Sequence, residues 1–177
     1  MLVLVNEKDE PVGLMEKMDV HRKALLHRAF SVFLFNSEGQ MLLQRRALEK
    51  YHSGGLWTNT CCSHPYPDET PVEAASRRMH EELGFNAVVK PAFHFIYKAA
   101  LDNELTEFEF DHVLVGTYDG QVFPNKDEVS DYRYMSMQEL RVSLEDQPHH
   151  YTAWFKIAFP MLEAYLDKTN WVKNEKQ

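Results

Sequence analysis

Cysteine is scarce in this chain of 177 residues, and its two cysteines, Cys61 and Cys62, are neighbours. Consecutive Cα atoms lie about 3.8 Å apart, which is closer than an unstrained disulfide prefers. We therefore expect two free thiols, as in a reducing compartment. The chain also lacks a C-x-x-C pair, which argues against a structural zinc finger.

Long apolar runs are missing as well. Residues 1–5 form an apolar stretch that is too short for the core of a signal peptide, and no run approaches the roughly eighteen residues of a membrane span. A cytoplasmic protein without membrane contact is expected. No repeat, low-complexity block or Pro/Gly/Ser-rich linker divides the sequence, so residues 1–177 are expected to form one domain.

Basic residues are too few for a protein that tracks a nucleic-acid backbone. The 27 acidic residues outnumber the 19 basic ones, which gives a formal net charge of −8. A small anionic ligand is still compatible with this charge if local cations or a bound metal reverse the field at its site. Apolar residues at 44% and charged residues at 26% are typical of soluble globular proteins.

Several segments have the composition of β-strands, and turn residues separate many of them. Residues 37–40, with the sequence SEGQ, are expected to form a hairpin turn between two of these strands. The predicted strands cover residues 2–5, 29–35, 41–44, 57–62, 87–89, 93–97, 107–117 and 132–135.

The best-defined helix lies within residues 70–84. Thr70 and Glu73 form a capping box, Pro71 occupies the first helical position, and Gly84 follows the end. The apolar residues between them recur at helical spacing on one face.

Two more helices are predicted towards the C-terminal end. One opens at Ser136 with Glu139, and the other spans about 152–168 and is expected to bend at Pro160. Together with the strands, they predict an α/β protein of the α+β type, in which helices flank a mixed sheet.

Candidate reactive groups surround the first helix. Arg78 and Glu82 share one helical face, which in an isolated helix indicates a solvated ion pair. The preceding loop carries Cys62 and His64, and short loops often hold reactive or metal-binding groups. Taken singly, Cys62 is more typical of a small buried residue and His64 of a surface residue.

The segment TEFEFDH places Glu107, Glu109 and Asp111 on one face of a strand. Three stacked carboxylates repel one another unless water or a cation neutralises them, so a solvated edge and a metal site are the two alternatives. His21 and His27 precede the strongest strand and could reach the same ion. Imidazole with carboxylate suits Zn²⁺, Mn²⁺ or Fe²⁺.

Four basic residues lie at the edges of elements or on the first helix. Each alone is typical of a soluble surface. Together they could clamp a diphosphate, because guanidinium binds phosphate oxygens in pairs and lysine adds a mobile charge. These residues are Lys17, Arg46, Lys50 and Arg78.

Residues 69–85 resemble the Nudix box, whose pattern is a glycine, five residues, a glutamate, seven residues and then REUxEExGU, with U apolar. Two positions depart: Ser63 replaces the first glycine, and Arg78 replaces the glutamate after the arginine. Nudix hydrolases use that glutamate in their metal-binding cluster, so Arg78 speaks against metal-assisted hydrolysis. The matching residues are Glu69, Arg77, Met79, Glu81, Glu82, Gly84 and Phe85.

These departures, together with HRAFSVFLFN, QRRAL, GLWTNTCCSHP and EFEFDHV, resemble the type I isopentenyl-diphosphate isomerases over about residues 2–165. The resemblance implies an enzyme of isoprenoid biosynthesis that interconverts isopentenyl and dimethylallyl diphosphate. Its partner would be this small diphosphate, with neither nucleic acid nor membrane involved, and the chain would be a monomer or a weak homodimer.

The resemblance also implies two metal ions. One Mn²⁺, Zn²⁺ or Mg²⁺ ion would bind three histidines and two glutamates, and a separate Mg²⁺ would join the substrate diphosphate to Glu82 and the backbone carbonyl of Cys62. The spacing of the first two histidines varies in the family, which makes His21 the least secure ligand. The first set is His21, His27, His64, Glu107 and Glu109.

The implied reaction adds a proton to the terminal alkene carbon and removes one from C2. Cys62 and Glu109 would face opposite sides of the substrate, with Tyr97 beside Glu109 as a proton relay. Trp154 would stabilise the carbocation by about 2 kcal/mol, and the alternative for it is a core tryptophan. Lys17, Arg46, Lys50 and Arg78 would hold the phosphate oxygens.

Two rival functions remain at this level. A Nudix-type hydrolase would cleave a nucleoside diphosphate derivative, and a non-catalytic binding module would use the same ligands only for folding. The hydrolase predicts release of phosphate or nucleotide. The binding module predicts that metal removal unfolds the chain.

Overall fold

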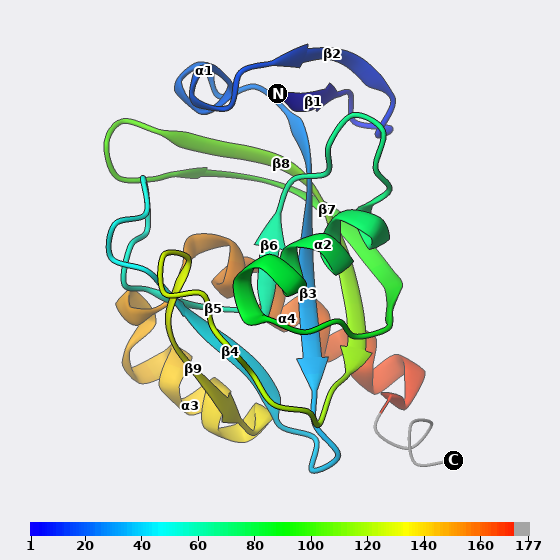
Figure 1. Cartoon of the computed structure of the whole chain (residues 1–177), viewed down its shortest axis with the longest axis vertical. Coiled ribbons are helices and arrows are strands. Elements are labelled where there is room, and N and C mark those ends of the chain that lie inside the picture. The colour runs from blue at the N-terminus through cyan, green and yellow to red at the C-terminus, as the bar shows by residue number, and fades with distance from the viewer. Residues whose placement is uncertain (172–177) are drawn as a thin grey trace.

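The computed structural model describes residues 1–171, and its nine strands form one mixed sheet. β3 runs through the middle of the sheet (Figure 1), parallel to β8 and antiparallel to β1, β4 and β6. β2 extends the sheet beyond β1, β7 beyond β8, and β5 and β9 beyond β4. The strands are β1 Leu2–Val5, β2 Pro11–Met15, β3 His27–Phe35, β4 Met41–Arg46, β5 Trp57–Thr58, β6 Cys61–Ser63, β7 Val89–Ala100, β8 Thr106–Thr117 and β9 Val129–Met135.

Helices cover both faces of this sheet (Figure 1). Alternate residues of β3 explain the layering: Phe30, Val32 and Leu34 pack in the core beneath α2, whereas Phe33 and Phe35 pack against α3 and α4. A strand buried on both faces needs the continuous apolar run that β3 has. The predicted mixed sheet between helices is confirmed. The helices are α1 Lys17–Lys23, α2 Pro71–Leu83, α3 Met137–Asp146 and α4 Ala153–Thr169, with a 3₁₀ turn, η1, at Pro148–His150.

α2 begins and ends as its sequence predicts. Thr70 and Glu73 form both hydrogen bonds of the capping box, and Pro71 starts the helix. Gly84 ends it at φ +73°, and a Cβ there would lie 2.8 Å from the Cβ of Phe123. Glycine is therefore required at this position by both the backbone angle and the close approach.

The other predicted helices and the hairpin turn are also confirmed. Ser136 and Glu139 form a capping box at the start of α3. α4 has Thr152 as its N-cap and contains Pro160, and the bend expected there stays a prediction. In the turn between β3 and β4, the side chain of Asn36 accepts amide hydrogen bonds and Gly39 has φ +78°.

The predicted strand boundaries need two corrections. Residues 57–62 form β5 and β6 rather than one strand, because the side chain of Asn59 bonds the carbonyls of Val32 and Cys61 where the chain changes direction. The strands predicted at 87–89 and 93–97 are one strand, β7, whose register shifts between Pro91 and Phe93. A bulge accommodates the proline because Pro91 has no N–H to donate.

Two N-terminal elements were not predicted. α1 is short and polar, and its N-cap is the side chain of Glu16, which accepts from the amides of Met18 and Asp19. β2 is largely exposed and contains Pro11 and Gly13, both of which are rare within strands. Neither segment has the apolar periodicity that indicates a buried element.

The structure bears on two further expectations, that of free thiols and that of a chain without a membrane span. Cys61 is buried, Cys62 is half-buried, and both are free thiols as predicted. No helix within residues 1–171 has the length and apolar character needed to cross a membrane. The predicted single domain also includes residues 172–177, which lie outside the described residues.

Candidate active site

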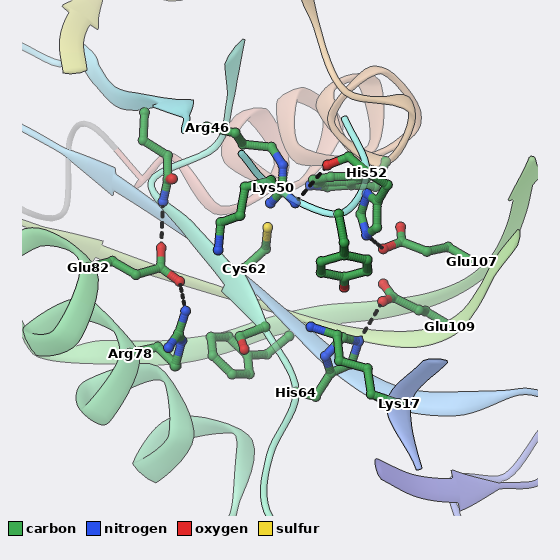
Figure 2. Close-up of a pocket in the computed structure, with 15 residues that line it drawn as sticks. Lys17, Arg46, Lys50, His52, Cys62, His64, Arg78, Glu82, Glu107 and Glu109 are labelled. Carbon is green, nitrogen blue, oxygen red and sulfur yellow. Dashed lines mark hydrogen bonds and ion pairs between the residues drawn. The ribbon is translucent and has the colours of Figure 1, made fainter. Parts of the chain in front are cut away.

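One pocket collects most of the predicted functional side chains (Figure 2). Four cations reach it from three separate segments of the chain, and a thiol, three glutamates and an indole also line it. Sequence alone left this convergence open, and the structure establishes it. The predicted residues lining the pocket are Lys17, Arg46, Lys50, Cys62, His64, Arg78, Glu82, Glu107, Glu109 and Trp154.

Strand register explains why Cys62 and Glu109 meet in this pocket. β3 pairs with β6 so that Ser31 lies opposite Cys62, and with β8 so that His27 lies opposite Glu109. β7 sets Tyr97 opposite Glu109 on the other side of β8. The two predicted proton-transfer groups therefore flank the same central strand, on backbones held by sheet hydrogen bonds.

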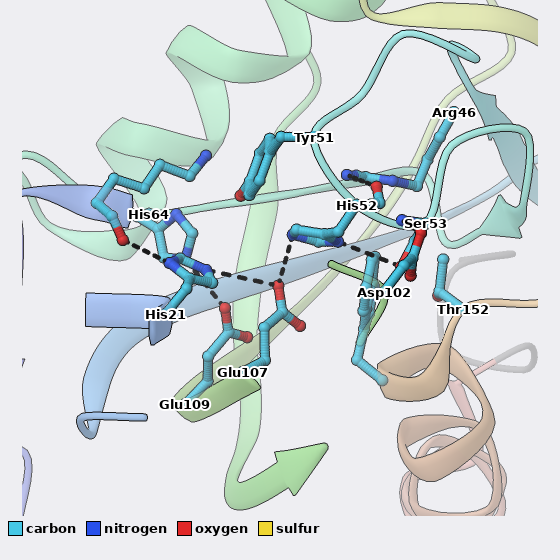
Figure 3. Close-up of polar contacts among 12 residues, drawn as sticks. His21, Arg46, Tyr51, His52, Ser53, His64, Asp102, Glu107, Glu109 and Thr152 are labelled. Atoms are coloured by element: carbon cyan, nitrogen blue, oxygen red, sulfur yellow. Dashed lines mark hydrogen bonds and ion pairs between the residues drawn. The ribbon is translucent and has the colours of Figure 1, made fainter. Parts of the chain in front are cut away.

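The histidines and glutamates predicted as metal ligands are adjacent. His21, His27 and His64 each offer a ring nitrogen within 4.8 Å of the others. His64 Nε2 lies 3.2 Å from His27 Nε2 and 2.9 Å from Glu109 Oε1. Glu107 Oε1 lies 3.9 Å from His21 Nε2. Figure 3 shows His21 and His64 beside the carboxylates of Glu107 and Glu109.

The ring orientation of two histidines suits metal binding. His21 Nδ1 donates to the carbonyl of Lys17 at 2.7 Å, and His27 Nδ1 donates to that of Leu25 at 2.9 Å. A carbonyl only accepts, so in the neutral rings the Nε2 lone pairs face the cluster. Among residues 1–171, His21 Nε2 has no hydrogen-bond partner. This buried orphan atom, within a set of imidazoles and carboxylates, fits a divalent ion.

Burial keeps two of the cluster imidazoles, those of His64 and His21, neutral. It lowers the pKa of His64 to about 3 and also lowers the pKa of His21. A neutral imidazole retains the lone pair that a metal requires, whereas a protonated one does not. At neutral pH these two rings are therefore in the state that binds an ion.

The carboxylates of β8 are not solvated. Glu107, Glu109 and Asp111 have exposed fractions of only 4%, 6% and 1%, so the alternative of a solvated edge is wrong. Burial raises the pKa of Asp111 well above its usual range. Burial also acts to raise the pKa of Glu109, but its interactions with the adjacent imidazoles of His27 and His64 outweigh burial and hold this pKa well below its usual range. Buried charge of this kind requires cationic partners.

Tyr97 connects two of these carboxylates. Its hydroxyl lies 2.7 Å from Glu107 Oε2 and 2.7 Å from Glu109 Oε2. Burial raises the pKa of Tyr97 well above its usual range, so the phenol keeps its proton. One O–H can donate to one oxygen at a time, and the phenol oxygen can accept from a protonated carboxyl group. Tyr97 can therefore pass a proton between the two glutamates.

Two of the pocket cations form ion pairs with glutamates of the same chain. Lys50 forms an ion pair with Glu128, and Arg78 lies 2.5 Å from Glu82 and 3.3 Å from Glu128. Glu82 is buried, so the solvated pairing expected for an isolated helix is wrong. Burial, helped by the neighbouring cations, lowers the pKa of Lys17 to about 8. A group of cations held this close together favours an anionic ligand.

Trp154 belongs to both the core and the pocket. It is 3% exposed, it packs in the cluster beneath α4, and its indole N–H donates to Asn59 Oδ1 at 3.3 Å. The guanidinium of Arg46 lies 5.3 Å from its ring centre. The two alternatives for this residue are therefore compatible, because a core tryptophan presents its face to the pocket.

Cys62 points its sulfur into the pocket (Figure 2). Burial raises the pKa of the Cys62 thiol well above its usual range. At neutral pH it is therefore a thiol rather than a thiolate, the form that can donate a proton and is a poor nucleophile.

Sequence reasoning missed three polar residues of the site. Gln44 donates to Glu82 Oε2 at 2.8 Å, Glu128 pairs with two pocket cations, and His52 lies 3.2 Å from Glu107. Gln44 lies within a predicted strand, and Glu128 has no neighbouring motif. His52 comes two residues after Lys50 and just before a Gly-Gly turn, which was the one available signal.

Similarity to known proteins agrees with this geometry. The family model of the NUDIX domain matches residues 25–155. Isopentenyl-diphosphate Delta-isomerase 2 of Photorhabdus laumondii is 47% identical over 171 residues, which cover 97% of this chain and 96% of that protein. Isopentenyl-diphosphate Delta-isomerase of Pectobacterium atrosepticum is 49% identical, over 93% of this chain and 92% of that protein.

Solved structures support the fold. A Deinococcus radiodurans protein superposes with a TM-score of 0.75 at 21% identity, covering 90% of this chain and 97% of that one. The MutT protein of Methanosarcina mazei gives a TM-score of 0.65 at 21% identity, covering 82% and 95%. With the NUDIX match and the near-full-length relatives, these results show that the chain belongs to the isopentenyl-diphosphate Delta-isomerase family, within the Nudix fold.

Proposed function

We propose that this protein interconverts isopentenyl diphosphate and dimethylallyl diphosphate. The observation that carries the proposal is that Cys62 and Glu109 line one pocket from strands on either side of β3. Moving the double bond by one position requires one proton to add to the terminal alkene carbon and another to leave C2, which lies two carbons away. Two proton-transfer groups on a rigid sheet meet that requirement.

The proton balance is simple. One group adds a proton to the terminal alkene carbon, which forms a C–H bond and leaves a positive charge on C3. The other removes a proton from C2, and those electrons form the new C2=C3 bond. We assign these two positions to Cys62 and Glu109, and Tyr97 provides Glu109 with a hydrogen-bonded path for its proton.

Trp154 and the burial of the site protect the cation between these steps. The indole face lines the pocket, and an aromatic face near a desolvated positive charge contributes about 2 kcal/mol. A cation with this reactivity captures water unless water is excluded. The enclosing core around Trp154 supplies that exclusion.

The diphosphate is assigned to the four pocket cations. Lys17, Arg46, Lys50 and Arg78 line the pocket together, and the guanidinium groups offer paired donors to phosphate oxygens. Lys50 and Arg78 are held in place by Glu128 before substrate arrives. This arrangement supports recognition of a diphosphate in a protein whose net charge is negative.

The metal assignment follows the donor sets. His21, His27, His64, Glu107 and Glu109 would hold one Mn²⁺, Zn²⁺ or Mg²⁺ ion, and Glu82 with the Cys62 carbonyl would hold Mg²⁺ beside the diphosphate. Such ions supply positive charge that neutralises buried carboxylates and phosphate oxygens. The orphan Nε2 of His21 and the close His27–His64 contact support the first site.

The expected partner is a small diphosphate rather than a macromolecule. A monomer or weak homodimer and a cytoplasmic location remain part of the proposal. Arg78 weighs against the hydrolase alternative. It stands where Nudix hydrolases carry another acidic metal ligand, and it forms an ion pair with Glu82 instead.

The proposal is tested by incubating the metal-loaded protein with isopentenyl diphosphate, or with a nucleoside diphosphate sugar, and recording ¹H and ³¹P NMR spectra. We expect conversion of the alkene signals without release of phosphate. Cys62→Ala and Glu109→Gln should each lower turnover by about 10³-fold or more. Near-normal turnover in either variant would remove that residue from proton transfer, and phosphate or nucleotide release without isomerisation would favour the hydrolase.

A further inference from the structure

His52 is a buried histidine next to the metal cluster, outside the ligand set assigned above. Its side chain is 2% exposed, and its Nε2 lies 3.2 Å from Glu107 Oε1. His52, His21 and Glu107 each offer a ligand atom within 4.8 Å of the other two, which makes a second potential metal-binding group. Figure 3 shows the His52 ring directed towards Glu107.

The ring of His52 is oriented like those of His21 and His27. Its Nδ1 contacts the hydroxyl of Ser53 at 3.2 Å, which leaves Nε2 facing the cluster. Although Nε2 is close to Glu107, the geometry is not that of a hydrogen bond, and Nε2 has no such partner among residues 1–171. Leaving a buried polar atom unpaired costs about 1–3 kcal/mol. Coordination of an ion would satisfy it.

The two potential metal-binding groups share His21, which decides how many ions they can hold. His21 Nδ1 is used by the carbonyl of Lys17, so its Nε2 is the single nitrogen available. One lone pair binds one ion. The groups His21–His27–His64 and His21–His52–Glu107 are therefore parts of the same centre.

The loop that carries His52 is anchored, as precise ligands require. The amide of Ser53 donates to Asp102 Oδ2 at 3.1 Å, which ties the loop to the turn between β7 and β8. Arg46 donates to the carbonyl of His52 at 3.2 Å. The His52 ring also makes edge contacts with Tyr51 and Trp154, at centroid distances of 4.3 and 5.9 Å.

We propose that His52 is a fourth imidazole ligand of the His/Glu metal centre, bound through Nε2 to the same ion as His21. The inference rests on the proposed function, in which this centre holds a divalent ion. Four imidazoles shift the donor set towards nitrogen, so the centre should prefer Zn²⁺ or Co²⁺ over Mg²⁺.

The variant His52→Gln distinguishes two roles for His52: a direct metal ligand, or a residue that only positions Glu107. The glutamine amide can donate a hydrogen bond to Glu107, but it lacks the imidazole lone pair that such metals prefer. His149→Gln is the matched control, because His149 is exposed on the 3₁₀ turn. His52→Asn serves as a second variant with a shorter side chain.

The experiment loads each purified protein with Co²⁺ and records the visible spectrum, the dissociation constant, and the hyperfine-shifted ring N–H signals of ¹⁵N-histidine-labelled samples. Four shifted histidines are expected in the wild type and in His149→Gln. In His52→Gln we expect three, an altered visible spectrum and Co²⁺ binding weaker by roughly 100-fold, the upper end of the range for outer partners.

Retention of the wild-type spectrum and affinity in His52→Gln would overturn the ligand assignment. If neither variant folds, the wild type alone decides, because a set of assigned shifted signals that lacks His52 excludes it as a ligand. Isomerisation measured on the same wild-type sample separates the two hypotheses. An active wild type in which His52 is the unshifted histidine removes His52 alone, whereas an inactive wild type with four shifted histidines removes the proposed function.

Discussion

Tyr97→Phe removes a single buried oxygen from between two glutamates. In the structure, the Tyr97 hydroxyl is 2.7 Å from Oε2 of both Glu107 and Glu109. A hydrogen bond to a charged group contributes about 1.5–3 kcal/mol, and one O–H makes one such bond at a time. We therefore expect the metal-free variant to lose about 1.5–3 kcal/mol of unfolding free energy, with no cavity term because the ring remains.

The same substitution should affect catalysis more than binding. Loss of the proton path beside Glu109 should lower kcat by about 10²-fold or more while KM changes little, because the phenol lies outside the cation group. Urea denaturation measures the stability and an NMR progress curve measures the rate. Tyr134→Phe is the control, since that half-buried hydroxyl makes no hydrogen bond within residues 1–171. A variant with wild-type stability and wild-type kcat would refute both parts of the reasoning.

Three further predictions concern the helix that carries Arg78. Arg77 holds the pKa of Glu69 below its usual range, so the pair stabilises the fold above the ordinary glutamate value of about 4.3 and loses this effect as pH falls through the folded value. Glu69→Gln should therefore cost about 0.5–1 kcal/mol at pH 7 and little in acid, measured by urea denaturation across pH. Gly84→Ala should cost about 1–2 kcal/mol in thermal unfolding, because it forces a left-handed backbone and a 2.8 Å approach to Phe123. Thr70→Ala should cost about 1 kcal/mol in the same assay through the lost cap.

Each of these predictions has a distinct contrary result. A Glu69→Gln deficit that does not change with pH would mean that the ion pair is not its source. An unchanged melting temperature in Gly84→Ala would show that neither the left-handed backbone at this position nor the approach to Phe123 costs stability. For Thr70, Thr70→Ser retains the capping hydroxyl and should behave like the wild type, so equal losses in both variants would argue against capping.

Local sequence rules predict the elements whose determinants are local. In both α2 and α3 the two residues of the capping box lie only three positions apart in sequence. The apolar run of β3 is likewise continuous in sequence, and it is buried on both faces. α1 was missed because a short polar helix with Glu16 as its cap has little local signal. Sequence predicts β5 and β6 as one strand because the hydrogen bond that Asn59 donates to the carbonyl of Val32 joins residues distant in sequence and leaves no trace in the local pattern.

The residues of the candidate site also fall into those with local sequence signals and those without. Sequence could identify Cys62, Glu82 and Glu109 as candidates because they belong to contiguous motifs. Burial of Glu107 and the position of His52 depend on the register of β8 and on a loop anchored by Asp102, which are contacts distant in sequence. A lone histidine has no spacing pattern, and for this reason His52 became visible as a candidate ligand only in three dimensions.

The most direct test of the central claim follows isopentenyl diphosphate with the metal-loaded wild-type protein in D₂O by ¹H and ²H NMR. Protonation at one carbon and deprotonation at another predicts dimethylallyl diphosphate with deuterium in the newly formed methyl group. An unchanged alkene in metal-replete protein, or product whose new methyl group carries no solvent deuterium, would contradict the account.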